Sequence, residues 1–129
     1  MNICLKVATA RINHSPREDE LVLNTTVKSG SGLGVVFAPT WDLVLASKSG
    51  TLSWQQYTEG YVRLMRLRYL DNQAAFERIL NSEQVVVLTC YCNDCYENHH
   101  CHRYLLVDIF RKLAENKGIA FEYAGELAR

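Results

Sequence analysis

An uninterrupted apolar stretch in the second half of the chain constrains the fold most. Residues 85–90, Val-Val-Val-Leu-Thr-Cys, have the length of a β-strand but lack the alternation of a strand that faces water. Such a run suits a central strand covered on both faces. Residues 105–113 then carry apolar side chains at helical spacing, residues 116–118 (Asn-Lys-Gly) are a typical helix stop, and residues 119–123 have strand character. This strand–helix–strand order predicts a parallel pair joined by a right-handed crossover.

The first half of the chain adds strands and helices to this unit. Strands are expected at residues 2–9 and 21–27, and helices at residues 41–48, 53–69 and 72–80. Thr40 is placed to cap the first helix, and Asp71 is placed to cap the third. Ser53 and Gln56 have capping-box spacing at the start of the second helix. We therefore expect one three-layer α/β domain over residues 1–129, with a mainly parallel sheet.

Size and charge exclude several classes of protein. With 129 residues the chain fits one domain, and no apolar run approaches the roughly 20 residues of a membrane span. The 14 basic and 14 acidic residues balance to zero net charge, which gives no support to nonspecific nucleic-acid binding. The first residues lack the basic region and apolar core of a signal peptide. We expect a protein that does not associate with membranes, whose oligomeric state the sequence leaves open.

Cysteines and histidines gather directly after the apolar strand. Four of the five cysteines lie within twelve residues, with three histidines among or beside them: Cys90, Cys92, Cys95, Cys101, His99, His100 and His102. An odd number of cysteines, most of them bunched, without an export signal argues for a cytoplasmic protein in a reducing compartment. Thiolates and imidazoles are the groups that bind soft or borderline metals. This segment is therefore the expected site of chemistry.

A metal centre is the first interpretation of the cluster. Cys92 and Cys95 have the spacing of a zinc knuckle, and Cys101 with His99 completes four ligands. Zinc is the expected ion, with an iron–sulfur cluster on the same thiols as the alternative. A second knuckle is missing from the sequence, so the pattern matches no standard zinc finger.

A reactive thiol is the second interpretation. The helix is expected to start near Cys101, where its N-terminus, His102 and Arg103 should lower the pKa of that thiol. In an enzyme, Cys90 and Cys101 are the candidate nucleophiles or metal ligands, His102 is the proton carrier and Arg103 clamps an anion. The remaining interpretation is that the cysteines are small buried residues or idle thiols, which we expect of Cys4.

Residues outside the cluster are weaker candidates. His14 lies in a polar loop and is expected to be solvated. Tyr61 and Arg66 are candidate ligand-binding residues, although helical spacing favours core packing for the tyrosine and a solvated face for the arginine. We expect the ligand to be an anionic small molecule. The carboxyl edge of an α/β sheet and the free N–H groups of a helix start both favour such a guest.

Two short motifs resemble the domain-of-unknown-function 488 (DUF488) family. They are the segment Val86–Cys92, and the Cys101-His102-Arg103 triplet that opens the next helix. The resemblance extends to residues 38–44 and 57–61 and implies a Rossmann-like α/β fold, but it carries no settled activity. Many family members have an acidic residue two positions after the cysteine of the strand, where this chain has Cys92. That substitution removes a candidate general acid or base and favours a metal.

Taken together, the sequence predicts a metal-supported Cys/His pocket for an anionic small molecule, such as a nucleotide or nucleobase derivative. One alternative is a non-enzymatic module that zinc holds together and that binds protein or nucleic acid. The other is a redox-active cluster in which Cys92 and Cys95 form a reversible disulfide. Whether the protein is an enzyme stays open at this stage.

Overall fold

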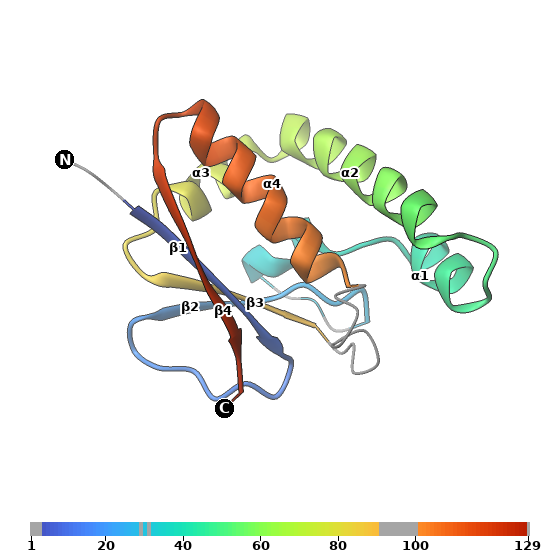
Figure 1. Ribbon diagram of the computed structural model, residues 1–129, viewed down its shortest axis with the longest axis horizontal. Coiled ribbons are helices and arrows are strands. Elements are labelled where there is room, and N and C mark those ends of the chain that lie inside the picture. Colours follow the sequence, from blue (N-terminus) through green and yellow to red (C-terminus); the bar gives the residue numbers. More distant parts are fainter. Residues whose placement is uncertain (1–3, 29, 31, 91–100, 129) are drawn as a thin grey trace.

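In the part of the chain that the structure describes, four strands and the segments that connect them make up the fold (Figure 1). The structure, a computed structural model, describes residues 4–28, 30, 32–90 and 101–128. In chain order the elements are β1 (Cys4–Arg11), β2 (Glu20–Asn24), the short 3-10 helix η1 (Gly32–Phe37), α1 (Trp41–Lys48), α2 (Trp54–Asp71), α3 (Gln73–Leu80), β3 (Val85–Cys90), α4 (His102–Asn116) and β4 (Ala120–Leu127).

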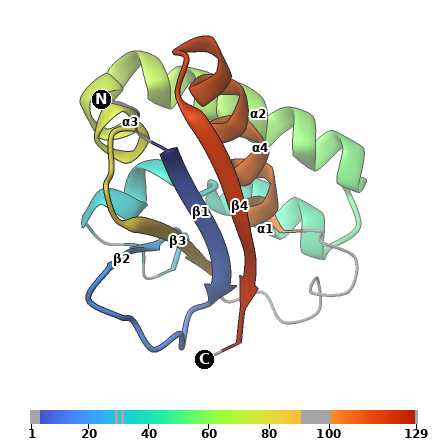
Figure 2. The ribbon, with the colours of Figure 1, turned by 60° about the vertical axis from the view of Figure 1, so that its left-hand side comes forward.

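The strands form one parallel sheet in the order β2-β3-β1-β4. The predicted α/β, Rossmann-like class with a parallel sheet is confirmed, and β3-α4-β4 is the predicted crossover unit. The connections from β2 to β3 and from β3 to β4 step across the sheet in the same direction. Right-handed crossovers in one direction place their helices on one face. Figures 1 and 2 accordingly show α2 and α4 on the same side of the sheet.

A connecting segment rather than a helix lies on the opposite face. Residues 12–19 join the end of β1 to the start of β2, and because these strands are parallel the segment must return along the sheet. His14 of this segment contacts Glu20. Leu21 faces the helices, and because side chains alternate along a strand, the neighbouring Glu20 faces the other side of the sheet. Beneath it the sheet presents small residues, including the fully buried Ala8. The third layer of the predicted three-layer domain is therefore a loop.

The main core lies between the sheet and the helices. Three phenylalanine rings meet there at edge-on angles, with centroids 4.9 Å apart for Phe37 and Phe76 and 5.4 Å apart for Phe37 and Phe110. Each is at most 1% exposed. Rings of this size dominate core energetics, so the cluster fixes α3 and α4 against η1. Among the described residues, no helix has both the length and the apolar character that crossing a membrane requires.

Two of the three predicted helix caps are confirmed. The Thr40 side chain accepts a hydrogen bond from the backbone of Leu43, and Ser53 forms its capping box with Gln56. The prediction for Asp71 is wrong, because α2 continues through that residue and position 72 becomes the cap of α3. That asparagine makes no side-chain cap and instead donates to a carbonyl of α2.

The edge strand β4 contains an irregularity beside the site described below. Val7 of β1 pairs with Tyr123, whereas the next residue of β1, Ala8, pairs with Gly125. Ala124 is thus an extra residue on β4, which is the definition of a β-bulge. Gly125 has a φ of 92°, a conformation that only glycine adopts without strain.

Candidate functional site

Two cysteine sulfurs meet where β3 ends and α4 begins. Cys90 is the last residue of β3, and Cys101 is the N-cap of α4, although its side chain makes no cap hydrogen bond. Their Sγ atoms lie 2.8 Å apart, and the residues are 2% and 4% exposed. Both are free thiols. The predicted meeting of sulfur at the strand exit and the helix start is confirmed for this pair.

A buried arginine donates to both sulfurs. Arg103 is completely buried, and its Nη1 lies 2.8 Å from Cys90 Sγ and 3.1 Å from Cys101 Sγ. Although burial opposes its charge, the neighbouring sulfurs and Glu126 raise the pKa of Arg103. The guanidinium is therefore a fixed positive charge beside the thiols. Its predicted role as the clamp of an external anion stays a prediction.

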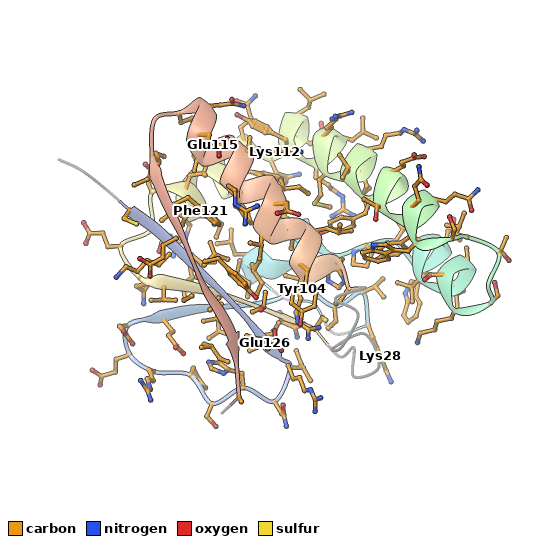
Figure 3. All side chains as sticks on the ribbon, in the orientation of Figure 1. Lys28, Tyr104, Lys112, Glu115, Phe121 and Glu126 are labelled. Carbon is orange, nitrogen blue, oxygen red and sulfur yellow. The ribbon has the colours of Figure 1, made fainter. Side chains whose placement is uncertain are left out.

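The other side of the guanidinium contacts a carboxylate on β4. Glu126 accepts from Arg103 Nη2 at 3.1 Å and from Nε at 3.4 Å. The Tyr104 hydroxyl accepts from Nη2 at 3.0 Å and donates to the carboxylate at 3.1 Å. Figure 3 shows Tyr104 at the start of α4 and Glu126 on β4. Burial, outweighing the opposing charge of Arg103, raises the pKa of Tyr104, so its proton is retained. Sequence reasoning missed Glu126.

The tautomer of His102 follows from its contacts with Thr25. Its Nε2 lies 2.9 Å from the Thr25 carbonyl oxygen and 2.9 Å from the Thr25 hydroxyl. A carbonyl only accepts, and this hydroxyl already donates to Thr89, so Nε2 carries the hydrogen. The lone pair is therefore on Nδ1, which lies 3.9 Å from Cys101 Sγ. Burial first, and then the charge of Arg103, lowers the pKa of His102 to about 4, so the ring is neutral at pH 7 and carries its free lone pair on Nδ1.

The thiol of Cys101 differs from the sequence prediction. Position at a helix start predicts a lowered pKa, whereas burial, together with the hydrogen bond to Cys90 and its proximity, raises the pKa of Cys101 well above its usual value. Arg103 opposes this shift without overcoming it. The correction has a physical cause: the sequence shows the helix end and the basic neighbours, but not the loss of water. Without a metal, Cys101 is a protonated thiol.

Three potential metal ligands converge at this point. The ligand atoms of Cys90, Cys101 and His102 all lie within 4.8 Å of one another, and all three residues are buried. Two thiols and an imidazole are a donor set that zinc accepts. Of the four ligands predicted from the sequence, Cys101 belongs to this group, whereas Cys92, Cys95 and His99 lie outside the described residues.

The two candidate ligand-binding residues on α2 have different positions. Tyr61 is fully buried, donates its hydroxyl hydrogen to the Phe37 carbonyl at 2.6 Å, and lies with its ring centroid 5.6 Å from that of His102. It therefore forms part of the wall behind the imidazole. Arg66 is exposed on the same helix. The arginine of α2 that reaches inward is Arg68, which donates to the carbonyls of η1.

Comparison with known families gives one match. Residues 34–114, more than half of the chain, match the family described as the active DUF488-N3 subclade, DUF488-N3a. The chain belongs to the DUF488 family. The matched segment contains both site cysteines and the residues that open α4, but it includes neither Thr25 nor Glu126. No curated protein and no solved structure matches the chain.

Proposed function

We propose that this member of the DUF488 family is a zinc-dependent enzyme acting on an anionic small molecule, such as a nucleotide or nucleobase derivative. Its metal centre consists of Cys90, Cys101 and the Nδ1 atom of His102. The convergence of these three ligand atoms is the observation that carries the proposal. A neutral imidazole with a free lone pair beside two sulfurs is the form in which histidine binds a metal.

The surroundings of His102 support metal binding. Imidazoles that bind metals in proteins commonly donate their second N–H to a carboxylate or a backbone carbonyl, which fixes the tautomer and the ring orientation. Here the Thr25 carbonyl accepts from Nε2. Thr25 also donates to the Thr89 carbonyl at 2.8 Å, so the acceptor is itself fastened to β3. The imidazole is held with Nδ1 on the side of Cys101.

The charges of the site also favour a divalent ion. Arg103 and Glu126 cancel one another across a 3.1 Å ion pair. Zn²⁺ that displaces the protons of Cys90 and Cys101 adds two positive charges and leaves two thiolates, so the net charge of the buried site does not change. Metal binding of this kind releases protons and is therefore stronger at higher pH.

The catalytic role rests on the number of ligands and on the family. Catalytic zinc sites have three protein ligands and an open position, whereas structural sites are closed by four. Within the described part of the chain three ligands converge. The description of the matched family as an active subclade supports catalysis. An anion at the open position would lie near the metal and the free N–H groups of the first turn of α4, which favour negative charge.

Metal content tests the centre directly. Protein purified without chelators or a metal-affinity column should contain about one zinc per chain by elemental analysis, the stoichiometry of a mononuclear site. Cys90→Ser and Cys101→Ser should each lose most of it. Cys4→Ser is the matched control, because Cys4 is exposed at the start of β1, and it should keep the metal. Wild-type metal content in Cys90→Ser would refute the centre.

Two further measurements test the open position and the ligand. Cys92→Ser and Cys95→Ser should keep their zinc if the site is open, whereas a loss would indicate a closed structural site. Adenosine 5′-monophosphate and adenosine should be titrated into the zinc-loaded protein by calorimetry. The proposal expects the phosphate-bearing compound to bind more tightly. Equal affinity for the two compounds would contradict the proposal that the ligand is an anion.

The second candidate function is that of a reactive thiol, in which Cys90 and Cys101 act as a pair without a metal. The 2.8 Å separation of Cys90 and Cys101 and the shared Arg103 donor favour it. In this arrangement Cys101 donates its S–H to Cys90, and Arg103 stabilises a thiolate at Cys90 through a second hydrogen bond. Selective labelling of Cys90 by iodoacetamide, in protein free of zinc after purification, is the result that would favour this candidate.

A further inference from the structure

The bulge in β4 changes which face of the sheet its last residues occupy. Phe121 pairs with Leu5, and both belong to the core under the helices. Side chains alternate along a strand, so without an interruption residues 123, 125 and 127 would share that face and Glu126 would point the other way. The extra residue, Ala124, shifts the alternation by one.

The shifted register places Glu126 on the helix face. Glu126 pairs with Thr9, and the next residue, Leu127, pairs with Ala10. Leu127 packs with Ala8 and Ala10 in the small cluster on the opposite face, so Glu126 lies on the side where α4 begins. Bulges occur beside functional sites because they re-aim a side chain. Here the side chain that is re-aimed is the carboxylate contacting Arg103.

The carboxylate determines where the arginine points. Glu126 holds Nη2 and Nε of Arg103, which are two of the three guanidinium nitrogens. A guanidinium is planar, so fixing these two nitrogens fixes Nη1, the atom that donates to both sulfurs. The Tyr104 hydroxyl holds the carboxylate in turn. With its side chain 12% exposed, Glu126 is largely withdrawn from water.

We infer that Glu126 is a positioning residue of the metal centre: presented by the β4 bulge, it aims Arg103 Nη1 at the sulfurs of Cys90 and Cys101. The inference rests on the proposed metal centre. Hydrogen bonds to metal-bound thiolates tune their electron density, and partners of this kind typically alter metal affinity by roughly 10–100-fold. Glu126 lies beyond the segment that matches the family, so this device is carried by the C-terminal strand of the chain.

Cobalt(II) is a suitable probe, because it replaces zinc and its thiolate charge-transfer band reports on the sulfurs. Wild-type protein, Glu126→Gln and Arg103→Lys are titrated with CoCl₂ under exclusion of oxygen. Glu126→Gln should still bind one cobalt per chain, with a dissociation constant roughly 10–100-fold higher. Its charge-transfer band should move in the same direction as that of Arg103→Lys, because both changes weaken the N–H donors to sulfur.

Three controls separate positioning from general damage. Glu122→Gln changes an exposed carboxylate on the same strand and should leave the band and the affinity unchanged. In the Arg103→Lys background, Glu126→Gln should have little further effect, because two residues that act through one contact are not additive. Deletion of Ala124 should leave the band and the affinity near their wild-type values, because it removes the bulge but still leaves Glu126 opposite Thr9 on the helix face.

The outcomes are distinguishable. Cobalt that fails to bind wild-type protein overturns the proposed metal centre and this inference with it. Wild-type binding together with an unchanged or oppositely shifted band in Glu126→Gln overturns the inference alone, as does an effect that persists in the Arg103→Lys background. If Glu126→Gln does not fold by circular dichroism, Glu126→Asp takes its place. It keeps the charge but shortens the reach, and a smaller shift in the same direction is expected.

Discussion

Each face of the sheet buries an acid–base pair, and the two pairs serve different ends. On the helix face, Arg103 and Glu126 bond to each other and the arginine also reaches two sulfurs. On the opposite face, His14 Nε2 lies 2.8 Å from Glu20, while His14 Nδ1 is buried with no hydrogen-bond partner among the described residues. The first pair is part of a larger cluster, because its arginine also donates to two thiols. The second fastens the segment between β1 and β2, so burial of an acid–base pair alone does not mark a functional site.

Breaking the helix-face pair should have the largest effect on stability. Arg103→Met leaves the Glu126 carboxylate without its partner, and removing one member of a buried pair typically costs about 3–5 kcal/mol. Urea denaturation should show this loss in the free energy of unfolding. The double variant Arg103→Met, Glu126→Leu should recover most of it, because neither charge then remains. A single variant within 1 kcal/mol of wild type would show that the pair is dispensable.

Acid should destabilise the metal-free protein because it protonates His102, which lies on the helix face of the sheet. The pKa of His102 is lowered from 6.5 to about 4 on folding, so between these values the unfolded chain binds the proton and the folded chain does not. Stability is therefore complete above pH 6.5 and falls as the pH drops to 4, by about 3 kcal/mol in total. Urea midpoints at pH 7, 5.5 and 4 measure this slope. In His102→Gln the slope should be much shallower, and an equally steep slope there would assign it to other groups.

Breaking the pair on the opposite face should have a smaller and purely structural effect. Glu20→Gln weakens the contact with His14, and a hydrogen bond of this kind contributes about 1 kcal/mol. The free energy of unfolding should fall by that amount, while cobalt affinity stays at the wild-type value. This is the matched counterpart of Glu126→Gln on the helix face. A change in metal affinity would mean that the two faces are coupled through the sheet.

The smallest effect is expected for a cysteine that belongs to neither pair. Cys4 is exposed on β1, and surface substitutions of this kind usually change the free energy of unfolding by less than about 0.5 kcal/mol. Cys4→Ser should therefore match wild type in thermal unfolding. A large loss would reveal that the start of β1 contributes more than its exposure suggests.

Local patterns predicted the elements well and their exact limits less well. The apolar run before Cys90 and the helical spacing after Cys101 predicted β3 and α4, and with them the meeting of the two sulfurs. Periodicity works here because both elements are long enough to display it. The last strand was expected to end at Tyr123 but continues to Leu127. Alternation breaks at Ala124, so the pattern ends before the strand does.

Sequence reasoning missed the residues that reach the site only because the fold brings distant segments of the chain together. Thr25, directly after β2, and Glu126 on β4 reach His102 and Arg103 from segments that are distant in the chain, and no local spacing encodes such contacts. His14 was expected in solvent, but it is 8% exposed. The loop that contains it is polar, yet its path between two parallel strands takes it back across the sheet. A glycine near the chain end, Gly125, was the available sign of the bulge.

The two sulfurs depend on separate rigid supports, one at the end of a central strand and one at the start of a helix. Cys90 is the last residue of β3, and Cys101 is the N-cap residue of α4. Doubling the length of a connecting loop costs only about 0.6 kcal/mol in closure entropy. A variant in which another sequence replaces residues 91–100 is therefore expected to keep the arrangement of Cys90 and Cys101, which would let engineering vary what approaches the two thiols.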